Sequence, residues 1–208
     1  AGSSFENKEE DDGSGIYAGG IAEVTGIFGT ERQQHLMAVA QSDHNGQRYN
    51  SASVNTRLFY NGQYDLDPAN SLQALAGYSR SQFGANGFYA APGDRDSEEL
   101  VRTAIFSLSS KHQLGDLMLS PRISNRYGED DYRYFGNDLS KGRSLHYTNA
   151  LMVELNSHLV TDLGTFGFGW ESRLEEIHSS NIGAHQRDNH GAYAELRSGW
   201  GTRLKGTL

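Results

Sequence analysis

The chain has 208 residues, a formal net charge of -8, 36% hydrophobic residues and no cysteine. Without cysteine it has no disulfide framework, thiolate metal site or cysteine nucleophile, and its acidic balance argues against a nucleic-acid binder. No apolar run approaches the roughly 18 residues that a membrane helix needs. The modest apolar content suits a β-barrel wall, in which only every second strand residue has to be apolar.

Residues 1–15 are small, acidic and polar. They have neither the basic start nor the apolar stretch of a signal peptide. Because they offer so little apolar surface to bury, we expect a flexible acidic loop or tail. Residues 16–208 are then expected to form one β domain.

The rest of the chain alternates apolar and polar residues with a period of two, which is the pattern of β-strands. Pro121 lies inside one expected strand and cannot donate a ladder hydrogen bond, so a bulge or irregular pairing is predicted there. A tenth strand begins near the end of the chain. The nine complete strands are expected at 16–27, 32–42, 53–64, 71–82, 98–112, 117–127, 147–159, 165–175 and 190–198.

The connections between these strands alternate between short and long. The short ones are expected at 28–31, 67–70, 114–116, 161–164 and 199–202. The long polar ones are expected at 43–50, 83–97, 128–143 and 177–189. An antiparallel sheet with two unlike ends is typical of an outer-membrane β-barrel, which has short periplasmic turns and long extracellular loops.

The segment 165–175 shows the alternation most clearly, because Phe166, Phe168 and Trp170 share one face. We predict that this face contacts lipid and that the opposite, charged face lines a lumen. The fold class is therefore all-β: an antiparallel transmembrane β-barrel, with about nine to ten strands of a larger barrel. The predicted lumen-facing residues are Glu171, Arg173 and Glu175.

Several short motifs follow one another in a specific order: 71–90, 120–126, 130–132, 145–148 and 175–183. Together they resemble the TonB-dependent outer-membrane receptors, especially the vitamin B12 and siderophore type found in Bacteroidetes. The resemblance implies a barrel of about twenty-two strands around an N-terminal plug that contacts TonB. The chain contains neither a plug nor that many strands, so it corresponds to a partial barrel.

The expected long loops carry aromatic and basic residues that suit a bulky, anionic ligand. Aromatic residues also form girdles at membrane interfaces, which explains them equally well. For the arginines Arg48, Arg133 and Arg143, an anionic substrate and lipopolysaccharide phosphates are equal alternatives. The candidate ligand-binding residues are Arg48, Tyr49, Phe88, Tyr89, Tyr132 and Arg133.

Metal binding has only weak sequence support. Asp130 and Asp131 are candidate calcium ligands in an extracellular loop, although they lack the spaced pattern of a dedicated calcium loop. His178, His185 and His190 do not have the spacing of a recognised metal site. No other cofactor is expected.

Enzymatic activity is not predicted, because the serine pairs Ser109-Ser110 and Ser179-Ser180 have no nucleophile elbow around them. A hydrolytic site would require a serine, a histidine and an acid to lie close together in the folded protein. The sequence leaves this possibility open, because it contains the histidines His44, His112, His146, His158 and His178.

We therefore predict transport at the cell outer membrane: uptake of a corrinoid, ferric siderophore or haem by a TonB-dependent receptor. The expected partners are the nutrient, outer-membrane lipid and lipopolysaccharide, and TonB, which would act through the plug. No nucleic acid is expected to bind. The alternatives are a smaller complete outer-membrane barrel with a binding or hydrolytic role, and a soluble β-sandwich binding module.

Overall fold

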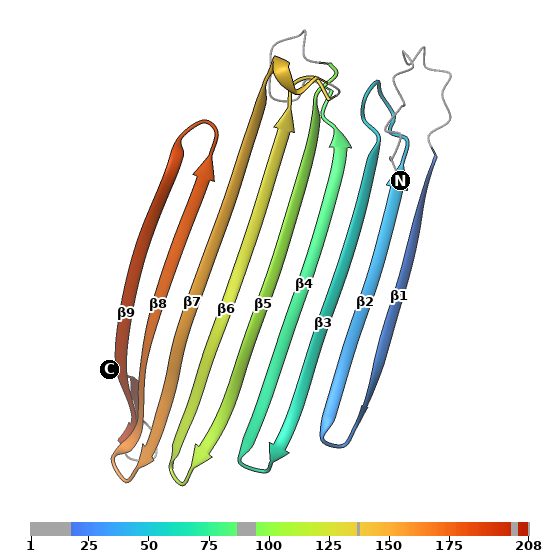
Figure 1. The fold of residues 1–208 in the computed structure, drawn as a ribbon. Coiled ribbons are helices and arrows are strands. Elements are labelled where there is room, and N and C mark those ends of the chain that lie inside the picture. Colours follow the sequence, from blue (N-terminus) through green and yellow to red (C-terminus); the bar gives the residue numbers. More distant parts are fainter. Residues whose placement is uncertain (1–17, 87–94, 137, 201–203, 208) are drawn as a thin grey trace.

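The computed structural model describes residues 18–86, 95–136, 138–200 and 204–207. They form one antiparallel sheet in which each strand is hydrogen-bonded to the next strand along the chain. Figure 1 shows this meander from β1 in blue to β9 in red. The strands are β1 Gly19–Thr30, β2 Gln33–His44, β3 Ser53–Asp67, β4 Asn70–Gly84, β5 Glu98–Leu114, β6 Leu117–Arg133, β7 Arg143–Thr161, β8 Gly164–Ser179, β9 Gly183–Trp200 and β10 Leu204–Thr207.

The two ends of the sheet differ, as the sequence predicts. At one end the connections 31–32, 68–69, 115–116 and 162–163 are tight turns. The Gly115 turn has a φ of 62°, which glycine adopts without strain. The fifth expected short turn lies partly outside the described residues, and the acidic segment 1–15 lies entirely outside them.

The prediction of four long loops at the other end is right for three of them and wrong for the fourth. The connections 45–52 and 85–97 are long, but 180–182 is a tight turn, and β6 and β7 continue until only 134–142 separates them. The expected loop 177–189 is therefore largely strand, and the expected loop 128–143 is shortened to its middle part, 134–142. Their polar composition misled the prediction, because ladder hydrogen bonds join backbone groups and do not require apolar side chains.

Pro121 interrupts the sheet without creating a bulge. The β5–β6 pairing runs from Ser109↔Arg122 directly to His112↔Leu119, and the register on the two sides of the gap is the same. On its other edge Pro121 pairs regularly with Leu155 of β7. The predicted irregularity is confirmed and the predicted bulge is wrong, because proline removes one donor without adding a residue.

The registers divide the side chains between two faces, because cross-strand partners point to the same side of a sheet. One face, which we call the apolar face, carries an apolar band across the middle of the sheet; the other we call the polar face. The apolar band includes Val39, Leu58, Phe106, Ile123, Val153, Phe168 and Trp170.

Aromatic side chains gather on the apolar face toward both ends of the strands. Toward the long connections, the rings of Tyr127 and Tyr147 stack with centroids 6.4 Å apart. Toward the tight turns, His35 stacks on Phe28 at 4.9 Å and meets Tyr64 edge-on at 5.2 Å. An apolar band between two aromatic levels is the arrangement expected for a wall between lipid and water.

Few apolar side chains of the described residues are buried. The buried apolar residues are Ala85, Leu100 and Tyr132, all close to the long connections, whereas Val24 is 74% exposed and Trp170 46% exposed on the apolar face. A soluble β-sandwich buries its apolar faces against a second sheet, and the described strands form only one sheet. The structure therefore contradicts the sandwich alternative.

The sheet is also open within the described residues, because β1 and β10 stand at opposite ends of the strand order. A smaller complete barrel would pair these two strands, so that alternative has no support here. The one helical element described is the 3-10 turn η1, Leu139–Lys141. No described helix has the length and apolar character needed to cross a membrane.

Candidate functional site

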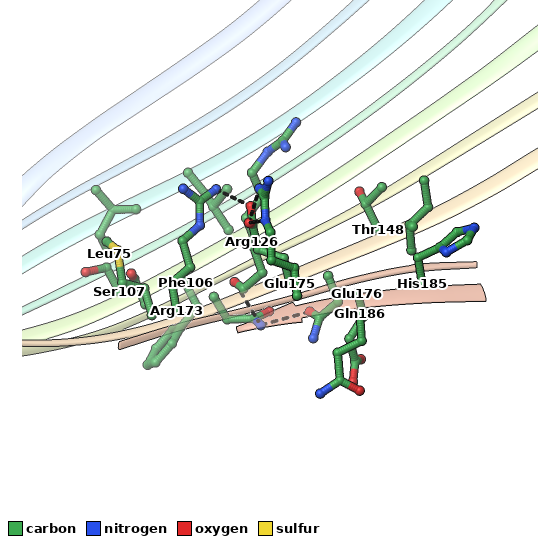
Figure 2. A pocket seen from close by; sticks show the side chains of 18 residues that line it. Leu75, Phe106, Ser107, Arg126, Thr148, Arg173, Glu175, Glu176, His185 and Gln186 are labelled. Atoms are coloured by element: carbon green, nitrogen blue, oxygen red, sulfur yellow. Dashed lines mark hydrogen bonds and ion pairs between the residues drawn. The ribbon is translucent and has the colours of Figure 1, made fainter. Parts of the chain in front are cut away.

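The polar face contains a hollow of about 740 Å³ between β4 and β9. Figure 2 shows that Arg126, Arg173 and Glu175 extend to one side of the sheet, whereas Phe106 and Gln186 extend to the other. This separation follows from the strand period, since successive side chains alternate between the two faces. The hollow therefore belongs to the polar face.

Two arginines contact one carboxylate in this hollow, and a third arginine lies on the same rung of the sheet. Arg173 Nη2 lies 2.6 Å from Glu175 Oε1, and Arg187 Nε donates to Glu175 Oε2 at 2.8 Å. Arg126 pairs with Ala150, and Ala150 pairs with Glu175. Arg126 therefore lies at the same level of the sheet as Glu175, two strands away from it. One carboxylate cannot neutralise three guanidinium groups, so the cluster carries an excess of positive charge.

Apolar side chains surround the arginine cluster. Leu75, Ile105, Met152 and Ile177 also line the hollow. A concave site that combines apolar walls with a few charged groups suits a small-molecule ligand, and guanidinium groups favour carboxylate or other planar anionic oxygens. The arrangement is chemically suited to binding an anion, and among the described residues that line the hollow no nucleophile is hydrogen-bonded to a base.

The three predicted lumen-facing residues lie on the polar face, opposite Phe168 and Trp170 on the same strand. Glu171 is not among the residues that line the hollow, and it pairs with Glu154 of β7. Arg122 approaches that second carboxylate, with Nη1 3.7 Å from Glu154 Oε2. That this face lines a lumen remains a prediction.

The candidate residues of the first long loop are held in a contact between two loops. Tyr49 donates its hydroxyl hydrogen to Asp96, and the Arg95 guanidinium carbon lies 4.6 Å from the centre of the Tyr49 ring. Arg48 uses its backbone N–H to bind Ser51 Oγ at 3.0 Å. Phe88 and Tyr89 lie outside the described residues.

Tyr132 and Arg133 are not loop residues, since both belong to β6. Tyr132 is only 6% exposed and meets the Tyr134 ring edge-on at 5.1 Å. Arg133 lies on the other side of the sheet, where Arg143 of β7 is its direct partner. Among the described members of the predicted ligand-binding set, Tyr132 and Arg133 therefore point to opposite faces of the sheet.

The weak metal candidates are also separated. Asp130 and Asp131 are adjacent residues of β6, so their carboxylates point to opposite faces. His178 and His185 likewise fall on opposite faces of β8 and β9. Among the described residues, no group of three or more acidic or histidine side chains is arranged to hold a metal ion.

Asp131 instead joins two arginines beyond the Tyr127–Tyr147 pair. Arg143 Nε donates to Asp131 Oδ1 at 2.5 Å, and Arg133 Nη2 donates to Oδ2 at 2.7 Å. Burial raises the pKa of the Asp131 carboxyl, but hydrogen bonds from Arg143 and Arg133 lower this pKa by more than burial raises it. The net shift of the Asp131 pKa is therefore downward. The same hydrogen bond raises the pKa of Arg143.

Sequence reasoning missed Arg126 and Arg187. Arg126 lies two and four positions after Ser124 and Arg122, so strand parity alone was enough to assign it to the polar face. Arg187 was hidden because residues 177–189 were read as a loop. Only the β8–β9 register, in which Arg187 pairs with Glu175, brings it to the cluster.

The structure is similar to two solved outer-membrane receptors. It matches the siderophore receptor PirA from Pseudomonas aeruginosa with a TM-score of 0.61 and 11% identity, over 88% of this chain and 30% of that one. It matches BauA, the ferric preacinetobactin receptor from Acinetobacter baumannii, with a TM-score of 0.55 and 9% identity, over 88% and 37% respectively. No family model matches the chain, and no curated protein does.

These similarities establish the class of fold: an antiparallel sheet of the kind that forms the wall of an outer-membrane β-barrel receptor. The predicted fold class is confirmed. The chain spans about a third of the length of each receptor, and at this level of identity the likeness concerns the fold and not the ligand.

Proposed function

We propose that this chain is part of the barrel wall of a TonB-dependent receptor that takes up a scarce, bulky nutrient across the outer membrane. The apolar face contacts lipid and the polar face lines the lumen. TonB acts through a plug domain, which is not among the described residues. The wall binds and passes the nutrient without making or breaking a bond in it.

One observation carries this proposal: the sheet has an exposed apolar band bounded by aromatic side chains on one face and a charged, hollowed surface on the other. A soluble sheet would cover the apolar face, whereas a membrane wall exposes it to lipid. The likeness to PirA and BauA supports the same reading.

We favour a ferric siderophore as the nutrient. The names of both similar receptors refer to siderophores or their ferric complexes, and the excess guanidinium charge around Glu175 suits an anionic chelate. A corrinoid and haem are the competing substrates, and the vitamin B12 type of receptor has no support beyond the sequence resemblance.

The test uses the full-length protein in detergent and follows quenching of tryptophan fluorescence during titration with four probes. These are a ferric trihydroxamate, a ferric tricatecholate, cyanocobalamin and haemin. We expect saturable binding of one ferric chelate, weakened about 10-fold by Arg126→Ala or Arg187→Ala, because a charged hydrogen bond contributes about 1.5–3 kcal/mol.

Arg57→Ala is the matched control, because Arg57 also lies on the polar face but on β3, outside the residues that line the hollow. Binding of cyanocobalamin or haemin alone would contradict the siderophore assignment. Equal binding by the Arg126 and Arg57 variants would contradict the role of the hollow.

For Arg133 and Arg143, we favour lipopolysaccharide phosphates over an anionic substrate. Both arginines share the side of the apolar face, beyond the tyrosine pair, where a phosphorylated head group of the outer leaflet lies and a lumenal substrate does not. Arg102, which binds Glu129 at 2.8 Å, lies on the same side.

A further inference from the structure

A chain of four hydrogen-bonded residues lies on the apolar face, toward the tight turns. Ser110 Oγ is 2.9 Å from His112 Nε2, and His112 Nδ1 is 2.7 Å from Asn70 Oδ1. Asn70 Nδ2 in turn donates to Asp67 Oδ1 at 2.8 Å. Ser110 and His112 are two positions apart on β5, and Asn70 is the direct β4 partner of His112, so sheet geometry alone brings the three together.

The network selects one tautomer of the neutral imidazole. The Asp67 carboxylate can only accept a hydrogen bond, so Asn70 must turn its amide nitrogen toward Asp67 and its oxygen toward His112. That oxygen also only accepts, so His112 Nδ1 carries the hydrogen. In the neutral ring His112 Nε2 is therefore a free base, and Ser110 donates its hydroxyl hydrogen to it.

A serine, a histidine base and a third group that orients the base form the arrangement used to activate a serine nucleophile. Here the orienting group is the Asn70 amide, which Asp67 holds in place. Asp67 also accepts the backbone N–H of Ala69 at 2.8 Å, so the tight turn anchors the whole chain. Hydrogen bonding by Asn70 lowers the pKa of the Asp67 carboxyl and keeps it an acceptor.

The depth of these residues suits an ester of a membrane lipid. Arg102 and His112 lie on the same face of β5. Because the strand is tilted, the ten positions from Arg102 to His112 correspond to roughly 25 Å of bilayer thickness, which equals the height of the apolar band of a membrane barrel. Ser110 and His112 therefore stand near its lower boundary, close to the Tyr64 level, where the acyl ester groups of phospholipids also lie. Both side chains are half-buried and open to that face.

The sheet is irregular directly beside Ser110. Ser110 stands opposite Pro121, at the point where the β5–β6 ladder is interrupted. Proline cannot donate a hydrogen bond to the neighbouring strand. The serine therefore lies next to a gap in backbone pairing, on the face where an ester would approach.

We propose that Ser110 and His112 form a catalytic pair that hydrolyses the carboxylic esters of phospholipids in the periplasmic leaflet, with Asn70 and Asp67 as positioning residues. This activity goes beyond nutrient uptake, takes place on the opposite face of the wall, and rests on the membrane orientation of the proposed function.

The reaction proceeds in two balanced halves. Ser110 Oγ attacks the ester carbonyl carbon while His112 Nε2 takes the hydroxyl proton; the carbon–oxygen bond to the glycerol then breaks, and that proton passes to the departing lysophospholipid. A water molecule next attacks the acyl-serine, giving one proton to Nε2. The bond to Oγ breaks, Ser110 regains the proton and a fatty acid leaves.

The test reconstitutes the full-length protein in phosphatidylethanolamine vesicles and measures lysophospholipid and fatty acid by mass spectrometry. A fluorophosphonate probe, followed by peptide mapping, reports which serine becomes covalently modified. We expect both products and a label on Ser110. Ser110→Ala should abolish the label and slow hydrolysis about 10³-fold or more.

Ser109→Ala is the matched control, because Ser109 is the adjacent residue on the polar face and should keep full activity. Asn70→Ala should slow labelling of Ser110, and Asn70→Asp combined with Asp67→Asn should restore it, since a carboxylate also accepts from Nδ1 and the amide at position 67 then donates to that carboxylate. A merely structural asparagine would not change the labelling rate.

Migration of unheated protein on denaturing gels verifies that each variant is folded and inserted. If the wild-type protein inserts but gives no label on Ser110 and no product above protein-free vesicles, the hydrolytic site is overturned while the uptake proposal stands. Failure of the wild-type protein to insert would instead contradict both. Hydrolysis that persists unchanged in Ser110→Ala would also overturn the assignment.

Discussion

At the scale of single residues, the Asp131 carboxylate forms ion pairs with two arginines at the outer end of β6 and β7. It is 1% exposed, and it lies between Arg133 and Arg143, which are direct cross-strand partners. Without it two like charges would face each other across the ladder, which is destabilising. Its pKa is lowered in the folded state, so its stabilising effect is present above the ordinary value of 3.8 and is lost as pH falls through the lower, folded pKa.

Asp131→Asn should therefore open the outer end of β6 and β7. We expect a local loss of about 1–3 kcal/mol, seen as amide hydrogen exchange at least about 10-fold faster in 129–133 and 143–147 at pH 7. The difference from wild type should shrink below about pH 4. Asp130→Asn is the control, and an equal effect of both variants would show that general strand polarity, not the arginine bridge, holds this end.

At the scale of elements, β8 and β9 depend on a glycine that gives space to an aromatic ring. Gly169 pairs with Tyr193, whose hydroxyl donates to Asn156 Oδ1 at 3.0 Å across β8. A Cβ on Gly169 would collide with the Tyr193 ring and come within 2.8 Å of the Leu155 carbonyl oxygen. The ring covers the glycine, a device that stabilises glycine-containing strands.

Gly169→Val should displace Tyr193 and destabilise the β7–β9 region by about 1–3 kcal/mol, the usual cost of overpacking. The measurement is the temperature at which the folded band is lost on denaturing gels. Gly26→Val provides the comparison, because a Cβ on Gly26 meets nothing within 4 Å. An unchanged melting temperature for Gly169→Val would mean that the Tyr193 contact does not stabilise the sheet.

At the scale of the whole molecule, the proposed function requires lipid against the apolar face and water against the polar face. Val153 is 37% exposed on the apolar face, between Ile123 and Ser172. Met152, the preceding residue, lines the hollow on the polar face. The pair offers a direct comparison of the two surfaces at one depth.

Val153→Arg should cost about 2–4 kcal/mol near the bilayer midplane and reduce the fraction of protein that inserts into vesicles. Met152→Arg should insert nearly as well as wild type, because the polar face contacts water. The readout is the protease-protected fraction after reconstitution. If Met152→Arg were the more disruptive variant, the assignment of lipid and lumen would have to be reversed.

The amino-acid sequence by itself determined the strand period, the tight turns and the alternation of Phe166, Phe168 and Trp170 against charged residues, because these depend on local geometry. It did not determine where the outer strands end, since a polar segment such as 128–133 pairs through its backbone as readily as an apolar one. Register is a property of two strands, so only the tertiary structure could bring Arg187 to Glu175, separate Asp130 from Asp131, and join Ser110 and His112 to Asn70.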